Sequence, residues 1–348
     1  MQEVIPVSIC IPTYNGARYL EACLDSVLSQ TYKNIEILVV DDGSTDSTVE
    51  VLERYATIDQ RIRLVRNKKN LGLVGNWNRC VELAKGEWIK FVFQDDLIAP
   101  ACLERMLAAA QPGSSLVFCR RDFIFEEGTT PSARNAYLEG KSLVALLFPD
   151  DTLVSARQFS EMVLNNMERN LIGEPTVVML HRRVFQQFGS FNSHLIVSCD
   201  TEYWIRVGIH TGVVPVPEVL ASFRVHDDSV SAQSLAKREY RMNVLDEIAV
   251  LHEVVFNPAY QPIREVAAES GIDLTRQFRK KALWAYGLAK QAERDEKHPD
   301  NSLMNEWREV APHFKGLSPI PLRYSVQRQG RLLKYQLRSL LGLKQTEQ

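Results

Sequence analysis

The sequence predicts an α/β protein built on a parallel sheet, followed by a mostly helical C-terminal region. In the first 120 residues, short runs rich in Val and Ile alternate with segments of helical periodicity, which is typical of βαβ units. The run Ile35–Val40 is nearly all apolar, as a strand buried on both faces should be. From Ala236 onward the pattern is helical and is interrupted by prolines. We therefore expect two domains, 1–235 and 236–348.

Each element of the first domain follows from its own residues. Val7–Ile11 is the first strand, and Ala17–Gln30 follows as a helix because its apolar residues recur on one helical face. Ser44 begins a Ser/Thr/Asp run that is expected to cap the next helix, which extends to about Tyr55. No element can be placed between residues 121 and 160. The remaining elements expected are strands at Ile62–Arg66, Trp88–Phe93 and Leu116–Cys119, helices at Gly75–Ala84 and Ala101–Ala110, and regular segments at Thr176–Leu180 and, with helical spacing, Cys199–Val207.

Composition excludes several classes of function. The 348 residues contain 41 Lys and Arg against 43 Asp and Glu, so a net charge of −2 gives no bulk attraction for nucleic acid. The six cysteines have no Cys-x-x-Cys spacing, which indicates buried reduced thiols rather than a zinc module or a disulfide framework. The N-terminus lacks the features of a signal peptide, and no apolar run approaches the roughly 18 residues needed to span a membrane. A cytoplasmic protein is expected.

Polar residues follow three of the predicted strands, in the segments Pro12–Gly16, Asp41–Ser44 and Gln94–Asp96. Ligands of open α/β sheets bind at the carboxyl ends of strands, so we expect these segments to meet. The adjacent carboxylates of Asp95 and Asp96 would be compensated by Mg²⁺ or Mn²⁺, although a helix N-cap or a turn explains the pair equally well. Asp41 and Asp42 precede the run that caps the next helix, and a carboxylate at this strand end can also accept hydrogen bonds from a base or ribose. Tyr14 is suited to stack on a base.

These residues together resemble the family 2 glycosyltransferases, which are inverting enzymes of the GT-A fold. The resemblance is carried by Val7–Gly16, Leu28–Tyr32, Glu36–Asp46 and Phe93–Asp96, and it covers residues 4–231. It implies a Rossmann-like nucleotide-sugar-binding half, 1–120, and an acceptor-binding half, 121–235. The donor-binding residues that it implies are Pro12, Thr13, Tyr14, Asn15, Asp41, Asp42, Asn70, Gly72, Asn78 and Asp95.

The resemblance also implies the metal ligands and the catalytic base. Asp96 takes the place of the family's ligand to Mn²⁺ or Mg²⁺, and His226 that of a histidine which often completes the metal site, although a lone His is as often structural. Asp200 takes the place of the general base that deprotonates the acceptor hydroxyl. Its alternative role is the N-cap of the helix that carries Trp204. Two residues depart from the family pattern: Cys199 replaces a Glu, and Phe93 replaces a carboxylate.

The expected function is metal-dependent transfer of a sugar from a nucleotide-diphosphate donor, UDP-linked by preference, to a glycan or a lipid-linked saccharide in bacterial surface-polysaccharide assembly. A sugar nucleotidyltransferase and a non-catalytic binding module are the alternatives. Residues 315–344 contain seven Lys or Arg and no acid, with apolar residues such as Val326 and Leu333 on one helical face. This pattern fits peripheral contact with the inner face of the membrane and, equally, a helix packed on the catalytic domain.

Overall fold

The computed structural model describes residues 6–167, 169–226, 241–294 and 302–330, the last range without residues 315, 318, 319, 321 and 328. The chain divides into two compact units. Unit 1 comprises residues 1–233 and 258–270, and unit 2 comprises residues 234–257 and 271–348. The domain boundaries expected from the sequence, 1–235 and 236–348, stay a prediction.

A mixed sheet forms the centre of unit 1, and within the described residues its strand order is β3-β2-β1-β4-β7-β6-β8-β5. The first four strands in this order are parallel. β7 runs antiparallel to β4 and β6, β6 runs parallel to β8, and β5 runs antiparallel to β8. The strands are β1 (Val7–Thr13), β2 (Ile35–Asp41), β3 (Ile62–Arg66), β4 (Trp88–Phe91), β5 (Leu97–Ile98), β6 (Leu116–Phe125), β7 (Val178–His181) and β8 (Val214–Val225).

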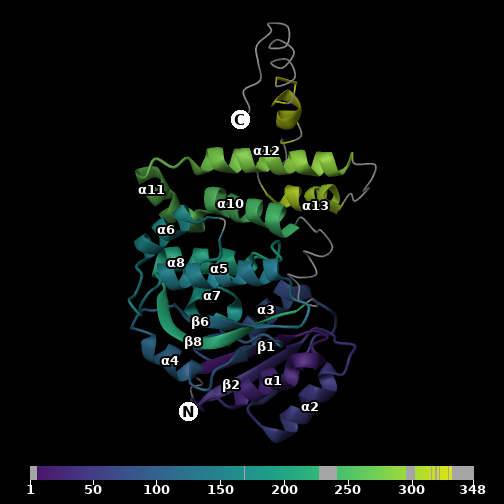
Figure 1. Cartoon of the computed structure of the whole chain (residues 1–348), viewed down its shortest axis with the longest axis vertical. Helices are drawn as coiled ribbons and strands as arrows, with labels where there is room; N and C mark the ends of the chain where they lie inside the picture. Colours follow the sequence, from purple (N-terminus) through teal and green to yellow (C-terminus); the bar gives the residue numbers. More distant parts are fainter. Residues whose placement is uncertain are drawn as a thin grey trace. The chain divides into compact units, whose positions relative to one another are not determined.

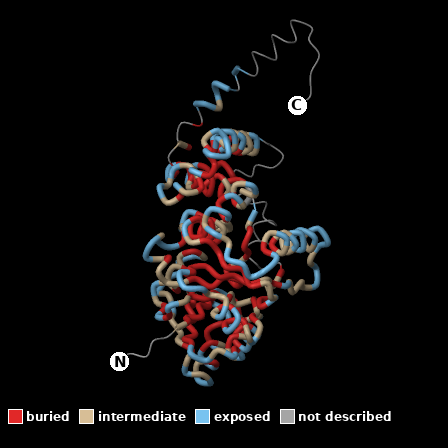
Figure 2. The backbone as a smooth tube through the Cα atoms, turned by 90° about the vertical axis from the view of Figure 1, so that its left-hand side faces the viewer, coloured by how far each residue is buried: buried red, intermediate tan, exposed pale blue. Residues whose placement is uncertain are grey.

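The parallel part of the sheet forms as the apolar runs predict. Every residue of β1 and β2 is buried, and the two strands pair in register from Val7 with Ile35 to Thr13 with Asp41. Strands that are buried on both faces need helices as cover. Figure 2 shows the buried segments, in red, inside this unit with exposed segments around them. All six cysteines are free and buried, as expected.

Helices connect the parallel strands, so the predicted strand–helix alternation is confirmed. They are α1 (Ala17–Leu28), α2 (Thr48–Ile58) and α3 (Gly72–Leu83), whereas α4 (Cys102–Ala109) connects β5 to β6. In α1 the buried residues are those of the predicted apolar face, from Leu20 to Val27. Figure 1 shows α1 and α2 beside the purple strands of the N-terminal half.

The Ser/Thr/Asp run that begins at Ser44 contains the N-cap of the second helix, Ser47, as expected. Helix α2 begins at Thr48, and its backbone N donates to Asp46 Oδ1 at 3.0 Å. Ser44 Oγ instead accepts a hydrogen bond from Asn15 N at 2.9 Å and donates to the Asp41 carboxylate. The hydroxyl of Ser44 therefore joins the loops after β1 and β2, and it makes no hydrogen bond to the first turn of α2 among the described contacts.

Residues 121–160, which the sequence pattern left unassigned, complete β6 and form α5 (Pro131–Leu147) and the start of α6 (Ala156–Asn165). β6 extends to Phe125 instead of ending at Cys119, with register shifts beside Arg120. Both helices begin at an N-cap whose side chain accepts a backbone hydrogen bond, Thr130 for α5 and Ser155 for α6. α5 packs on β6, and α6 packs on α8 (Cys199–Thr211). The other helical segments of unit 1 are η1 (Pro175–Val177), α7 (Arg183–Phe188), η3 (Pro258–Tyr260) and α11 (Gln261–Glu269).

Unit 2 is helical in its described residues, which confirms the helical C-terminal region. It contains η2 (Arg241–Asp246), α10 (Glu247–Phe256), α12 (Leu274–Ala292), α13 (Ser302–Val310) and η4 (Ala311–His313). α12 begins where the Asp273 carboxylate accepts a hydrogen bond from Arg276 N at 2.8 Å. The expected amphipathic helix of the tail falls outside the described residues from residue 331 onward. No helix in the described part of the chain is both long and apolar enough to cross a membrane.

Candidate active site

A cavity of about 680 Å³ in unit 1 opens at the carboxyl ends of β1 and β4. It brings together the three strand-end segments that the sequence singled out and the two expected site residues of the acceptor half, Asp200 and His226. Asp41, Asn78 and Asp96 are not among the residues that line the cavity. The expected site residues that do line it are Pro12, Thr13, Tyr14, Asn15, Asp42, Asn70, Gly72, Asp95, Asp200 and His226.

Hydrogen bonds between the Tyr14 backbone and the Gln94 side chain fix the loop after β1 against the loop after β4. Tyr14 N donates to Gln94 Oε1 at 2.9 Å, and Gln94 Nε2 donates to Tyr14 O at 3.1 Å. A side chain at Gly16 would overlap Gln94, because a Cβ there would lie 2.1 Å from Gln94 Oε1. The Tyr14 side chain is 49% exposed at the cavity, so its ring is free to stack on a flat ligand.

The two aspartates after β2 have different surroundings. Asp41 is fully buried and accepts hydrogen bonds from Gly43 N and Ser44 N, both at 3.2 Å. Asp42 lines the cavity and is nearly buried. Its carboxylate accepts from Asn67 Nδ2 and Leu71 N, both at 2.8 Å, and from Gly72 N at 2.9 Å. Asp42 therefore holds the segment that contains Asn70 and Gly72 at the cavity wall.

The two aspartates after β4 face in different directions. Asp95 lines the cavity, and its Oδ2 lies 2.9 Å from Nε2 of His226. Asp96 is fully buried behind it, where it accepts hydrogen bonds from Thr176 Oγ1 and, at 3.0 Å, from Arg224 N. Burial, together with the charge of Asp95, raises the pKa of Asp96 well above its ordinary value. The role of Asp96 as principal metal ligand stays a prediction.

Asp200 lines the same cavity from the first turn of α8. The N-cap of this helix is Ser198, so Asp200 is not the cap. The side chain is buried, with Asn170 Nδ2 3.4 Å from Oδ2 and Thr201 Oγ1 3.2 Å from Oδ1. Burial raises the pKa of Asp200 to about 7, with a smaller contribution from the charge of Glu174. A carboxylate with this pKa is matched to proton transfer near neutral pH.

Asn78, an expected donor-binding residue, has a different contact. Its Nδ2 donates to Phe191 O at 3.0 Å, and its Oδ1 accepts from Phe191 N at 2.9 Å. The side chain thus ties α3 to the segment that precedes α8. Cys199, which replaces a Glu of the family pattern, is fully buried, and its Sγ donates to Ile196 O at 3.3 Å.

Sequence reasoning missed several residues that line the cavity. Phe93 packs against Trp77, with ring centroids 4.9 Å apart, and both rings line the wall. At position 93, where the family often has a carboxylate, this chain therefore has an aromatic residue that packs on Trp77. Glu174 also lines the cavity, and its place in a Gly-Glu-Pro turn directly before a strand was the signal that could have located it. Gly16 and Gln94 also line the cavity and belong to the strand-end segments that the sequence singled out. The other missed lining residues are Arg18, Tyr19, Leu73, Asn76, Pro175, Ile196, Val197 and Phe223.

Comparison with known families decides the class. The model of glycosyl transferase family 2 matches residues 8–189, more than half of the chain. The chain belongs to this family. It is a glycosyltransferase, and this membership favours the transferase over the two alternatives considered from the sequence. An uncharacterized protein of Mycobacterium tuberculosis is 31% identical over 264 residues, which cover 75% of this chain and 80% of that protein.

Solved structures share the fold. S. aureus TarS residues 1–349, in complex with UDP-GlcNAc, gives a TM-score of 0.56 at 16% identity and covers 93% of this chain and 92% of its own. The mannosyltransferase PcManGT from Pyrobaculum calidifontis, in complex with GDP-Man and Mn²⁺, gives 0.54 at 18% identity and covers 99% and 89%. Likeness at this level of identity concerns the fold alone. The expected GT-A fold of this family 2 glycosyltransferase is confirmed.

Proposed function

We propose that this family 2 glycosyltransferase is a metal-dependent, inverting enzyme that uses a nucleotide-diphosphate sugar, UDP-linked by preference. One observation carries the proposal. A single cavity joins the strand-end loops of the nucleotide half to Asp200, a buried carboxylate whose pKa is raised to about 7 by burial. Such a cavity can hold a donor at one end and a proton acceptor at the other.

The nucleotide end is formed by the loops after β1 and β2. Pro12, Thr13 and Asn15 line it beside Tyr14, whose exposed ring is placed to stack on the base. Asn70 and Gly72 line the wall that Asp42 holds through the backbone N–H groups of Leu71 and Gly72. Polar backbone and side-chain groups around one exposed aromatic ring suit a nucleoside. Asp41 and Asn78 support this end from behind.

The metal end is formed by Asp95 and His226. A carboxylate oxygen and an imidazole nitrogen are ligands that Mn²⁺ accepts, and a carboxylate alone suits Mg²⁺. His226 faces Asp95 through Nε2, and its buried Nδ1 has no hydrogen-bond partner among the described residues. The described residues contain no group of three His, Cys, Asp or Glu side chains placed to hold a metal. We propose Asp95 and His226 as the groups that face a metal from the cavity wall. Asp96, the ligand that the resemblance implies, is buried behind Asp95, and its role as principal ligand stays a prediction.

The proposed transfer step uses Asp200 as the base and a bound nucleotide sugar as the donor. Asp200 accepts the proton of the acceptor hydroxyl as that oxygen attacks the anomeric carbon. The bond between the anomeric carbon and the diphosphate oxygen breaks on the opposite face, so the configuration inverts and the nucleoside diphosphate leaves with the bonding electron pair. A bound Mn²⁺ or Mg²⁺ would offset negative charge on that diphosphate. Asn170, within 3.4 Å of Asp200, orients the base.

The acceptor that we propose is a glycan or a lipid-linked saccharide in bacterial surface-polysaccharide assembly, at the cytoplasmic side of the membrane. The basic residues of segment 315–344 support contact with anionic lipid, which attracts clusters of Lys and Arg. Leu322 and Val326 of this segment are exposed, at 71% and 62%. Equal binding of the full chain and a chain ending at Gly316 to anionic liposomes would refute this contact.

Calorimetry with UDP, GDP and dTDP, with and without Mn²⁺, tests the donor site. We expect one nucleotide, UDP by preference, to bind more tightly when Mn²⁺ is present. The stereochemistry is then read by NMR from the first anomer of free sugar that the enzyme releases from the corresponding nucleotide sugar in water. Release of the inverted anomer supports the mechanism. Absence of binding to all three nucleotides, or release of the retained anomer, would refute it.

A further inference from the structure

Glu174 is a further carboxylate at the cavity, besides Asp42, Asp95 and Asp200, and the transfer mechanism above does not use it. It precedes η1 directly, at the end of the loop 170–174. Its side chain is 22% exposed and lines the same cavity as Asp95 and Asp200. A carboxylate that a protein keeps at a ligand cavity, away from full exposure, needs a structural reason or a ligand.

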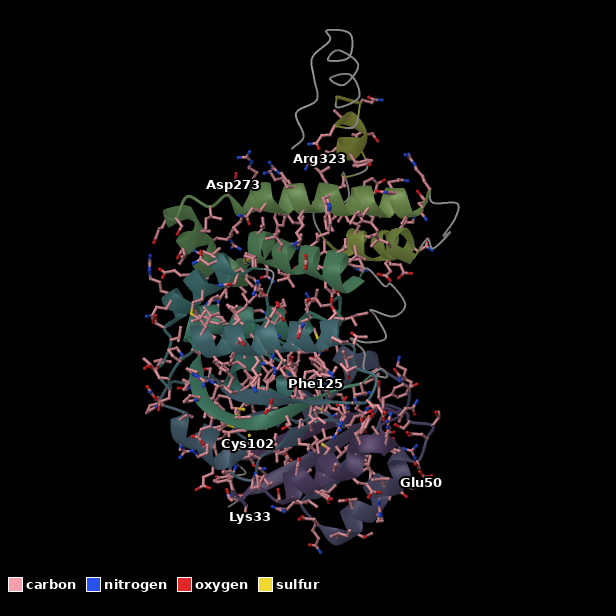
Figure 3. The ribbon with its side chains drawn as sticks, viewed as in Figure 1. Lys33, Glu50, Cys102, Phe125, Asp273 and Arg323 are labelled. Atoms are coloured by element: carbon pink, nitrogen blue, oxygen red, sulfur yellow. The ribbon has the colours of Figure 1, made fainter. Side chains whose placement is uncertain are left out.

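Arg121 holds Glu174 in place. The Arg121 Nε lies 2.5 Å from Glu174 Oε2, and the arginine is only 7% exposed. Its guanidinium lies over the ring of Phe123, 5.2 Å from the centroid. Phe123 packs in turn on Phe125, which Figure 3 labels, and on Phe223 of the cavity wall. This contact involves Oε2 and leaves the other carboxylate oxygen for a ligand.

The loop before Glu174 is built around this ion pair. Gly173 has φ +124°, and a Cβ at this position would lie 2.5 Å from Arg121 Nη1, so a side chain here would displace the arginine. The carbonyl of Gly173 accepts hydrogen bonds from Trp204 Nε1 at 2.9 Å and from Asn170 Nδ2 at 3.1 Å. The loop is thereby fixed to α8, the helix that carries Asp200.

Hydrogen bonds join the segment around Glu174 to both Asp96 and Asp200. Thr176, two residues after Glu174, donates through Oγ1 to Asp96, and Asn170 Nδ2, which donates to Gly173 O, lies 3.4 Å from Asp200 Oδ2. An inverting transfer places the anomeric carbon between the leaving diphosphate and the acceptor oxygen. The sugar ring attached to that carbon must therefore lie along the stretch of wall to which Glu174 belongs.

We infer that Glu174 binds a hydroxyl group of the transferred sugar and that Arg121 is the residue that positions it. This inference rests on the proposed function and extends it to recognition of the sugar. A carboxylate is a hydrogen-bond acceptor only, so it selects a sugar that presents a hydroxyl donor at this point. Hydrogen bonds to charged groups contribute on the order of tenfold or more in affinity.

The test compares each nucleotide diphosphate with its sugar conjugate. UDP and UDP-GlcNAc, and GDP and GDP-Man, are titrated by calorimetry into the wild type and into Glu174→Gln. We expect Kd for the nucleotide diphosphate to change less than twofold, which also shows that the variant is folded. The ratio of Kd for the nucleotide sugar to Kd for the nucleotide alone should rise about tenfold. An unchanged ratio would overturn the inference, whether both values stay constant or rise together.

Three further variants distinguish sugar binding from support of the fold. Glu218→Gln, in a carboxylate that also pairs with an arginine, Arg105, but lies outside the cavity lining, should leave the ratio unchanged. Arg121→Met should reproduce the raised ratio, and Arg121→Lys should restore part of the difference. If the ratio of the two Kd values rises as much in Glu218→Gln as in Glu174→Gln, the inference is overturned. Failure of the wild type to bind any of the nucleotides is a separate result, because it refutes the proposed function itself.

Discussion

The loop after β2 and the loop after β4 both carry an aspartate pair at the same edge of the sheet, yet their carboxylates are satisfied differently. Asp41 and Asp42 together accept hydrogen bonds from four backbone N–H groups and two side chains of nearby loops. Asp95 meets only the imidazole of His226 among the side-chain contacts that the structure describes. The loop after β2 is therefore an internally bonded wall, whereas the loop after β4 presents a carboxylate to the cavity.

In each pair, one aspartate lines the cavity and the other is fully buried, but their order along the chain is reversed between the two pairs. In the first pair, the buried brace is Asp41 and the lining residue is Asp42; in the second, Asp95 lines the cavity and Asp96 is the brace. A carboxylate that is already saturated with backbone donors has little capacity for a ligand. Removal of Asp95 or Asp200, which line the cavity and accept few hydrogen bonds, should therefore affect catalysis. Removal of a carboxylate that already accepts several backbone hydrogen bonds should affect the fold.

The largest effect is expected from Asp200→Asn. This change keeps the size of the side chain but removes the proton acceptor, so kcat should fall about 10²–10⁴-fold while Kd for the nucleotide stays constant. Initial rates of transfer, measured with the donor identified by calorimetry, provide the check. A rate within threefold of the wild type would show that another group accepts the proton.

The pH dependence of Asp200 sharpens the same prediction. Because burial raises its pKa to about 7, wild-type kcat/KM should rise with pH through about 7. The folded state binds this proton more tightly than the unfolded state, whose pKa is near 3.8, so the contribution of Asp200 to stability falls as pH rises from 4 to 7. Asp200→Asn should consequently raise Tm relative to the wild type at pH 8 but not at pH 4. Equal Tm differences at the two pH values would contradict the assignment.

The pair Asp95 and Asp96 gives the next largest effect. Asp95→Asn removes the charge that faces the cavity and should weaken Mn²⁺-dependent nucleotide binding about 10–100-fold. Asp96→Asn should have a smaller effect on Mn²⁺ affinity, since its carboxylate accepts hydrogen bonds from Thr176 and Arg224 N instead of facing the cavity. Calorimetric titration of Mn²⁺ in the presence of saturating nucleotide compares the two variants. A larger loss in Asp96→Asn would restore the assignment that the family resemblance implies.

Much of this arrangement could be predicted from the sequence, for physical reasons that differ by residue. The buried runs of β1 and β2 were predictable because a parallel sheet imposes an apolar pattern on each strand. The convergence of the loops followed from the rule that parallel strands end at one edge. Which member of each aspartate pair faces the cavity depends on contacts with distant segments, such as those of Asp96 with Thr176 and Arg224, and no local pattern records them.

The acceptor half was harder to predict for the same reason. Residues 121–160 were left unassigned, although Ser155 and Gln158 form a capping box that marks the start of α6. Glu174 was missed because its partner Arg121 lies far away in sequence, on a strand that continues past the expected end at Cys119. Within the run expected to cap the second helix, Asp46 accepts the hydrogen bond from Thr48 N, whereas the hydroxyl of Ser44 bonds with Asn15 N and Asp41 of the strand-end loops.

Asp42→Ala tests the bonded wall. The change removes the acceptor of Leu71 N, whereas Asn67 Nδ2 keeps Asn76 Oδ1 and Gly72 N keeps Asn70 Oδ1 as a second acceptor. The loss of these hydrogen bonds should lower the free energy of unfolding by about 1 kcal/mol. Urea unfolding followed by circular dichroism measures it. Unchanged stability together with abolished nucleotide binding would mean that Asp42 binds the nucleotide directly and does not stabilise the segment around Leu71 and Gly72.

The smallest effect is expected from Ser44→Ala, which tests how the loops after β1 and β2 are joined. The hydroxyl donates to Asp41 and accepts from Asn15 N, so its removal should lower the free energy of unfolding by about 1 kcal/mol. Because Asn15 lines the cavity, the same variant should also weaken nucleotide binding, by less than Asp95→Asn does. Thr45→Ala is the matched control, since Thr45 Oγ1 makes only a long contact of 3.4 Å with Asn15 Oδ1. Equal losses of stability in the two variants would show that the hydroxyl of Ser44 does not join the loops.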